Sequence, residues 1–185
     1  MRVLAISGSL RRASTNTAAL EALARLAPEG VKVLVYRDLA KLPPFNPDDD
    51  VEDGPKPEPV ETLRTLVHAS DAIVIAAPEY AHGLPGALKN ALDWLVASET
   101  FAGKPVALIN VSPRAFHAQA SLRETLATMA ARLVPEAFAA LSLAGKSPTA
   151  DEVLADPVNA RRLKESLEAL LEMLSQADRL ATSPP

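Results

Sequence analysis

The sequence contains no cysteine, and it has no long uninterrupted run of hydrophobic residues. The absence of cysteine excludes disulfides, thiol nucleophiles and cysteine-ligated metal sites, and it is compatible with a reducing cytosol. No segment approaches the roughly 20 apolar residues of a membrane-spanning helix. The apolar run before Ser7 is also too short for a secretory signal. We therefore expect a soluble, cytoplasmic protein that does not contact a membrane.

A surplus of positive charge is also missing, since 19 Lys and Arg residues face 23 Asp and Glu residues, for a net charge of −4. Binding to duplex nucleic acid relies on excess Lys and Arg, so the sequence predicts no nucleic-acid partner. The composition, with 48% hydrophobic and 23% charged residues, is typical of a globular protein. A chain of 185 residues fits one domain. We expect this single domain to span residues 1–180, followed by a frayed tail at 181–185.

Short apolar runs alternate along the chain with longer segments of helical period. Unbroken runs rich in β-branched residues are typical of strands that are buried on both faces of a parallel sheet. The predicted strands lie at residues 3–6, 31–36, 72–77, 106–111 and, with a less regular pattern, 137–143. Apolar stripes at helical spacing lie at residues 20–26, 60–67, 84–95, 122–133 and 163–174.

This alternation predicts an α/β fold, a flavodoxin-like three-layer αβα sandwich around a five-stranded parallel sheet in the order 2-1-3-4-5. In that order the strand sequence reverses between the first and third strands. Ligands of open α/β sheets bind at this switch point, outside the carboxyl ends of the strands. The turns that follow Ser7, Ala77 and Val111 are therefore the segments in which we expect a site.

The first of these turns, at residues 7–17, combines hydroxyl side chains, one Asn and two Arg with the start of a helix. A helix N-terminus, hydroxyl donors and a guanidinium together suit a terminal phosphate monoester. The turn is neither G-x-G-x-x-G nor a nucleotide P-loop, which disfavours a Rossmann pyrophosphate and nucleoside triphosphate hydrolysis. Alternatively, Ser14 or Asn16 merely caps the helix. The predicted phosphate-binding residues are Ser9, Arg11, Ser14, Asn16 and Thr17.

The second turn, at residues 78–86, contains two prolines and two glycines, which favour a rigid turn with backbone amides facing a ligand. Tyr80 offers an aromatic surface suited to a flat heteroaromatic ring with polar edges. Alternatively, Tyr80 packs internally and His82 is a solvated loop residue, or Glu79 and His82 form an acid–base pair. The predicted ring-binding residues are Pro78, Glu79, Tyr80, Ala81, His82 and Gly83.

The third turn, at residues 112–117, adds further polar side chains. We predict that Ser112 donates to the edge of the ring, and that Arg114 or His117 meets a nicotinamide nucleotide or an electron acceptor. The acidic run at residues 48–53 is conceivable as a metal site, but such runs are mostly solvated loops. No metal site is therefore predicted.

Two long motifs carry a resemblance to a known family. Residues 8–16 match G-S-[LI]-R-x-x-S-x-N, and Pro78–Trp94 matches P-E-Y-N-x-[SG]-x-P-G-x-L-K-N-A-[IL]-D-W, except that Ala81 replaces the usual Asn. The chain thus resembles the NADPH-dependent FMN reductase family, which includes quinone, azo-dye and chromate reductases. The third turn departs from the glycine-rich ending of many members, which leaves the choice of acceptor and nicotinamide open.

The resemblance implies that FMN binds with its phosphate at the first turn and its ring against the second, with Ser112 at the ring's edge. It implies hydride transfer from NADPH or NADH to FMN, and then to a small acceptor such as a quinone, free flavin, azo compound or metal oxyanion. It also implies a homodimer or homotetramer. The flavin carries this chemistry, so no side chain is predicted to be catalytic. The alternative is a flavodoxin-type FMN carrier without direct NAD(P)H activity.

Overall fold

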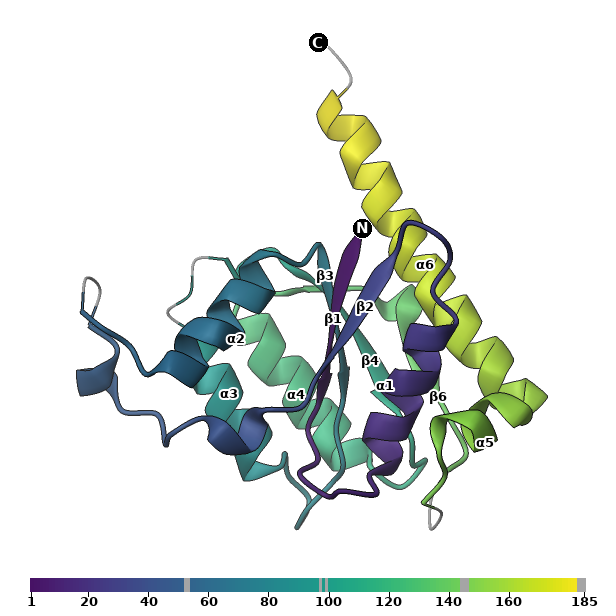
Figure 1. The fold of residues 1–185 in the computed structure, drawn as a ribbon, viewed down its shortest axis with the longest axis horizontal. Helices are drawn as coiled ribbons and strands as arrows, with labels where there is room; N and C mark the ends of the chain where they lie inside the picture. The colour runs from purple at the N-terminus through teal and green to yellow at the C-terminus, as the bar shows by residue number, and fades with distance from the viewer. Residues whose placement is uncertain (52–53, 97, 99, 144–146, 183–185) are drawn as a thin grey trace.

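The architecture comes from a computed structural model that describes residues 1–51, 54–96, 98, 100–143 and 147–182. One parallel sheet runs through the molecule with helices on both faces (Figure 1). Its strands are β1 (Arg2–Ser7), β2 (Lys32–Tyr36), β3 (Ala72–Ala76), β4 (Pro105–Asn110), β5 (Arg132–Leu133) and β6 (Ala139–Ala140). The order β2-β1-β3-β4-β5 confirms the predicted flavodoxin-like sheet, and β6 also pairs with β4.

The helices divide between the two faces of the sheet (Figure 1). They are α1 (Thr15–Arg25), α2 (Glu58–His68), α3 (Gly86–Val96), α4 (Phe116–Thr128), α5 (Ala150–Ala155) and α6 (Pro157–Thr182), with 3₁₀ turns η1 (Leu39–Lys41), η2 (Pro47–Asp49) and η3 (Pro135–Ala137). Alternate side chains of β1 enter opposite cores, so Val3 packs with α1, α5 and α6, whereas Leu4 packs with α2, α3 and α4. No described helix is long and apolar enough to cross a membrane.

The fifth strand is divided, which the sequence did not predict. Leu133 in β5 pairs with Val106 near the start of β4, whereas Ala139 in β6 pairs with Ile109 near its end. The 3₁₀ turn η3 interrupts the pairing between them, and it opens on Pro135, which has no N–H to donate. The predicted strand at 137–143 therefore corresponds only to β6.

The fourth helical stripe was predicted to extend to Leu133, and this was wrong. Helix α4 ends at Thr128, and Leu133 lies in β5 instead. The chain leaves the helix at Ala130, which adopts a left-handed φ of 56°. The short helix α5 was missed, although Thr149 and Glu152 form a complete capping box at its start. Helix α6 ends at Thr182, so residues 183–185 of the predicted tail lie outside the described residues.

The segment that precedes α2 is anchored to α3 rather than fully solvated. The Asn90 side-chain amide donates to the Pro43 carbonyl at 2.9 Å and accepts from the Phe45 N–H at 2.7 Å. The indole N–H of the buried Trp94 donates to the same Pro43 carbonyl at 2.9 Å. Residues at the end of the second sequence motif therefore hold the chain that crosses beside them.

The acidic run at 48–53 is only partly a solvated loop. The carboxylate of Asp50 accepts from the Arg64 guanidinium at 2.8 Å, and the Asp50 side chain is only 5% exposed. Arg64 also donates to the Trp94 carbonyl at 2.6 Å, so this ion pair reinforces the same anchor. Residues 52 and 53 of the run lie outside the described residues.

The substitution Asn90→Ala removes both of its hydrogen bonds to the anchored segment and leaves the partly buried Phe45 N–H without its partner, whereas the Pro43 carbonyl keeps its bond from Trp94. We expect a decrease of about 2 kcal/mol in the free energy of unfolding, measured by urea denaturation. Asn46→Ala is the matched control, because Asn46 is exposed and makes one local cap bond to Asp48. Equal losses of stability in the two variants would contradict the anchoring role of Asn90.

Candidate functional site

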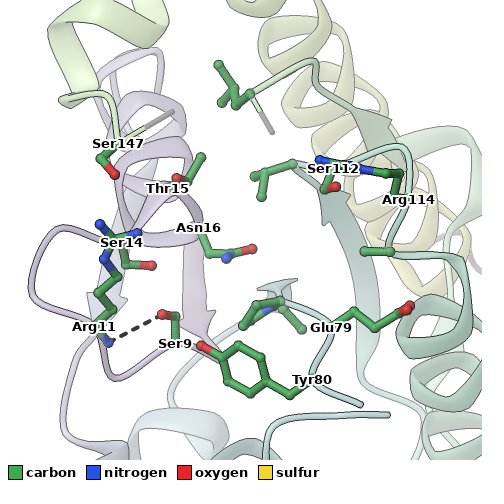
Figure 2. Close-up of a pocket in the computed structure, with 15 residues that line it drawn as sticks. Ser9, Arg11, Ser14, Thr15, Asn16, Glu79, Tyr80, Ser112, Arg114 and Ser147 are labelled. Atoms are coloured by element: carbon green, nitrogen blue, oxygen red, sulfur yellow. Dashed lines mark hydrogen bonds between the residues drawn. The ribbon is translucent and has the colours of Figure 1, made fainter. Parts of the chain in front are cut away.

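A crevice of about 520 Å³ lies at the carboxyl ends of β1, β3 and β4, where the strand order reverses (Figure 2). Its volume falls within the range of small-molecule sites. The lining residues are Ser9, Arg11, Ser14, Thr15, Asn16, Ala77, Pro78, Glu79, Tyr80, Val111, Ser112, Arg114, Ala115, Leu143 and Ser147. The three turns that were singled out in the sequence therefore meet at one cavity.

Gly8 brings the first turn against the end of β3. Its N–H donates to the Ala76 carbonyl at 2.8 Å, which extends the contact between β1 and β3 by one step. A Cβ atom at this position would lie 3.0 Å from Leu88 Cδ2 and 3.2 Å from Ala77 Cβ. A side chain here would thus require Leu88 or Ala77 to shift, whereas glycine permits the close approach without that shift.

Two serine hydroxyls of the first turn have their lone pairs engaged by backbone donors. Ser9 Oγ accepts from the Arg11 N–H at 3.3 Å, and Ser14 Oγ accepts from the Thr17 N–H at 3.2 Å as the N-cap of α1. The expected capping by Ser14 and its place in the crevice therefore coexist. In both bonds the hydroxyl oxygen accepts, and no hydrogen bond among the described residues uses either O–H, so each O–H can donate to a ligand.

Asn16 is the most informative side chain of the crevice. It is only 5% exposed, yet its Oδ1 atom has no hydrogen-bond partner among the described residues. Figure 2 shows its amide between the first turn and Ser112. A buried polar atom without a partner is costly, and a ligand is one of its ordinary explanations. The first turn of α1 also carries no acidic side chain, so the partial positive charge of the helix N-terminus is not offset there.

Thr17 was predicted to bind phosphate, but it does not line the crevice. Its hydroxyl forms a 2.8 Å hydrogen bond with Ser7 Oγ beneath the turn. The Thr17 side chain therefore points toward the end of β1 rather than into the crevice, and the sequence motif does not reveal that difference.

The second turn closes through two backbone hydrogen bonds between Tyr80 and Gly83, of 3.1 and 2.9 Å. Ala81 and His82 take left-handed φ angles of 48° and 59°, as in a tight hairpin turn. Ala81, His82 and Gly83 thus form the tip, and none of them lines the crevice, although all three were predicted to do so. Tyr80 does line it and is 55% exposed, which disfavours a purely internal packing role.

Glu79 joins the second turn to the third. Its carboxylate accepts from the Ala118 N–H at 2.9 Å, in the first turn of α4, where backbone donors lack partners within the helix. The residue that precedes α4, Ala115, provides no side-chain cap. Glu79, which belongs to the second turn, therefore caps the N-terminus of α4. This bond holds α4 against the wall of the crevice that the second turn forms.

The third turn places Ser112 and Arg114 in the crevice but not His117. The Ser112 N–H donates to Asn110 Oδ1 at 3.0 Å, which shapes the turn. His117 instead stacks on His82, with ring centroids 4.3 Å apart and an angle of 23° between the planes. The two histidines join the outer ends of the second and third turns.

The sequence analysis missed six lining residues. Thr15, Ala77, Val111 and Ala115 are neighbours in sequence of predicted residues, so their positions within the turns were the available signal. Leu143 and Ser147 follow β6 and carry no motif. They reach the crevice because β6 pairs with Ile109 and Asn110 at the carboxyl end of β4.

A flavodoxin-like sheet with phosphate-type donors on one side of its switch point and an exposed aromatic ring on the other defines a protein of the flavin-nucleotide-binding class. The sequence model for NADPH-dependent FMN reductase matches residues 1–146. The chain therefore belongs to the NADPH-dependent FMN reductase family.

Individual relatives agree with this assignment. An NAD(P)H-dependent FMN reductase of Pseudomonas aeruginosa is 34% identical over 175 residues, which cover 92% of this chain and 93% of that protein. A quinone reductase of Escherichia coli K12 is 37% identical over 108 residues, or 57% of each chain. Among solved structures, the flavoenzyme FerB of Paracoccus denitrificans, an NAD(P)H:(acceptor) oxidoreductase, has a TM-score of 0.75 and 27% identity, covering 95% of this chain and 97% of that one.

The substitution Glu79→Ala removes the cap of α4. We expect it to lower the free energy of unfolding by about 1 kcal/mol, measured by urea denaturation. Glu79→Gln keeps an acceptor oxygen and is expected to retain more than half of that stability. If both substitutions cost the same, the negative charge rather than the hydrogen bond to Ala118 would be the source of the effect.

Proposed function

We propose that this protein is an NAD(P)H-dependent oxidoreductase that holds FMN in the crevice and passes electrons from NADPH or NADH to a small acceptor. The observation that carries the proposal is the buried Oδ1 atom of Asn16, an acceptor without a partner among the described residues, which a hydroxyl or N–H group of the ligand would satisfy beside the donors of the first turn. Bound in the crevice, FMN would supply the redox chemistry that links hydride donation by the nicotinamide nucleotide to reduction of the acceptor. The chain supplies binding, orientation and polarity.

At the phosphate end, donors of two kinds, hydroxyl and guanidinium, line one wall of the cavity. The O–H groups of Ser9 and Ser14 are free to donate because no hydrogen bond among the described residues uses them. Arg11 lines the same wall and is exposed, and no salt bridge among the described residues engages it. A guanidinium with these properties can close over a phosphate with a forked pair of hydrogen bonds.

At the ring end, the second and third turns form the wall. Pro78, Glu79 and Tyr80 line one side, and Ser112 offers a hydroxyl on the other. Because Glu79 is held by Ala118, its carboxylate is a positioning group rather than an acid or base in the proposed reaction. Arg114 is exposed on the open side and is suited to an anionic group of the donor or acceptor.

The proposal extends to assembly and location. Three large apolar side chains that belong to the turns around the crevice are exposed, namely Leu10, Tyr80 and Phe116. Exposed apolar groups gathered near a site are typical of surfaces covered by a partner. These exposed side chains support assembly into a homodimer or homotetramer. We further propose that each subunit is a single domain of residues 1–180 and that the protein is cytoplasmic. Quinones, free flavin, azo compounds and metal oxyanions remain the proposed acceptors.

The substitution Arg11→Ala removes the charged donor of the phosphate end. We expect the dissociation constant for FMN to rise by about 10- to 100-fold, because hydrogen bonds to charged groups contribute about 1.5–3 kcal/mol. Fluorescence titration of apoprotein with FMN measures this change. Arg12→Ala is the matched control, since Arg12 follows directly in the sequence but does not line the crevice, and it is expected to change the constant by less than about twofold. Equal effects would remove Arg11 from the phosphate site.

The reaction itself is tested by mixing the FMN-loaded protein anaerobically with NADPH or NADH and recording flavin absorbance. Rapid bleaching is expected, followed by recovery of the oxidised spectrum when a benzoquinone is added. Steady-state double-reciprocal plots are expected to be parallel, because donor and acceptor use the same open side in turn. A protein that binds FMN but does not bleach would be a flavodoxin-type carrier instead.

A further inference from the structure

A second cavity, of about 200 Å³, lies on the other side of the first turn. It shares Ser9 and Arg11 with the crevice, so the same short segment separates the two spaces. Its lining residues are Ser7, Ser9, Leu10, Arg11, Arg12, Thr17, Arg37, Leu39 and Ala40. Three of them are arginines and none is acidic. The proposed binding of FMN uses Arg11 but leaves Arg12 and Arg37 without a role.

The sheet register explains how these arginines meet. Ile6 of β1 pairs with Tyr36 of β2, which brings Arg37, directly after β2, beside the start of the first turn. The floor of the cavity is ordered, because Ser7 and Leu39 are buried and the Ser7 hydroxyl is bonded to that of Thr17. Two segments far apart in the sequence thus present guanidinium groups over one fixed polar base.

The charges of this cavity are not balanced by the residues that line it. Arg12 is exposed, and no salt bridge among the described residues reaches it. Arg37 contacts the carboxylate of Glu21 on α1, but Glu21 does not line the cavity. The net charge of the whole chain is −4, so this local excess of positive charge runs against the overall charge. Like charges gathered in one cavity repel each other, and a bound anion offsets that repulsion.

The position of Arg37 indicates which anion fits. In dinucleotide-binding α/β folds, an acidic residue about 20 residues beyond the first turn binds the free ribose 2′-hydroxyl of NAD, whereas an Arg nearby accommodates the 2′-phosphate of NADP. Arg37 directly follows β2, the neighbour of β1, and so shares that arginine's position, although the first turn here lacks the glycine-rich dinucleotide motif. The hydroxyls and guanidinium groups around it are the donors that a phosphate monoester requires.

We infer that the second cavity binds the 2′-phosphate of NADPH through Arg12 and Arg37, and that it makes the chain prefer NADPH to NADH. This inference rests on the proposed function. Because Ser9 and Arg11 border both cavities, a nicotinamide nucleotide that reaches the open side of the crevice can lay its adenylate half over the first turn. The first turn then contacts two phosphate groups, the phosphate of FMN in the crevice and the 2′-phosphate of NADPH in the second cavity.

The test is calorimetric titration of the FMN-loaded protein with adenosine 2′,5′-bisphosphate and with 5′-AMP, which differ only in the 2′-phosphate. We expect the bisphosphate to bind at least about tenfold more tightly, and Arg37→Ala or Arg12→Ala to remove most of that difference without weakening the binding of 5′-AMP. Glu21→Gln releases Arg37 from its contact and is expected to strengthen binding of the bisphosphate. The matched control is Arg161→Ala, an exposed arginine on α6 that pairs with Glu165.

Three results would overturn the inference. They are equal binding of the two nucleotides by the unsubstituted protein, an unchanged ratio in Arg37→Ala, and uptake of a second equivalent of FMN that Arg37→Ala abolishes. The last result would assign the cavity to the phosphate of a second flavin. Failure of this inference is distinguishable from failure of the proposed function, because Arg37→Ala is expected to keep its FMN affinity and its bleaching by NADH.

Discussion

The close approach of Gly8 to the end of β3 sets the position of the first turn and of the two cavities beside it. The N–H of Gly8 continues the contact between β1 and β3 by bonding to Ala76, and a Cβ atom here would contact Leu88 and Ala77 at 3.0 and 3.2 Å, closer than most Cβ contacts. The chain then leaves the sheet at Ser9, at the switch point itself. This places the first turn as a thin partition, with the crevice on one side and the arginine-lined cavity on the other.

The two sides of the crevice are built on different physical principles. On the side of the first turn, backbone N–H groups donate to the oxygens of Ser9 and Ser14, which holds each oxygen in place while its O–H can still rotate toward a ligand. On the side of the second and third turns, order comes from contacts between the turns, through the bond of Glu79 to Ala118 and the stacking of His82 on His117. A ligand that spans both sides thus meets a largely preorganised surface, which lowers the entropic cost of binding.

The sequence predicted the first four strands from continuous apolar runs and from one more alternating run at residues 31–36. It did not predict the divided fifth strand, whose two-residue pieces are too short to show a period. Within the site, spacing identified the three turns but not which side chains face the cavity. The left-handed conformation at Ala81 and His82 turns the tip of the second turn outward, and no residue type there reveals it. Leu143 enters the crevice through the pairing of β6, which is a property of the sheet rather than of the local sequence.

Because the fifth strand is broken, β5 and β6 pair with β4 as two separate short segments at this edge of the sheet. Because β6 pairs with the end of β4 independently of β5, a change of length within η3 can be absorbed there without shifting the register at Asn110. An insertion or deletion in η3 would therefore leave Leu143 and Ser147, which follow β6, in their positions at the crevice.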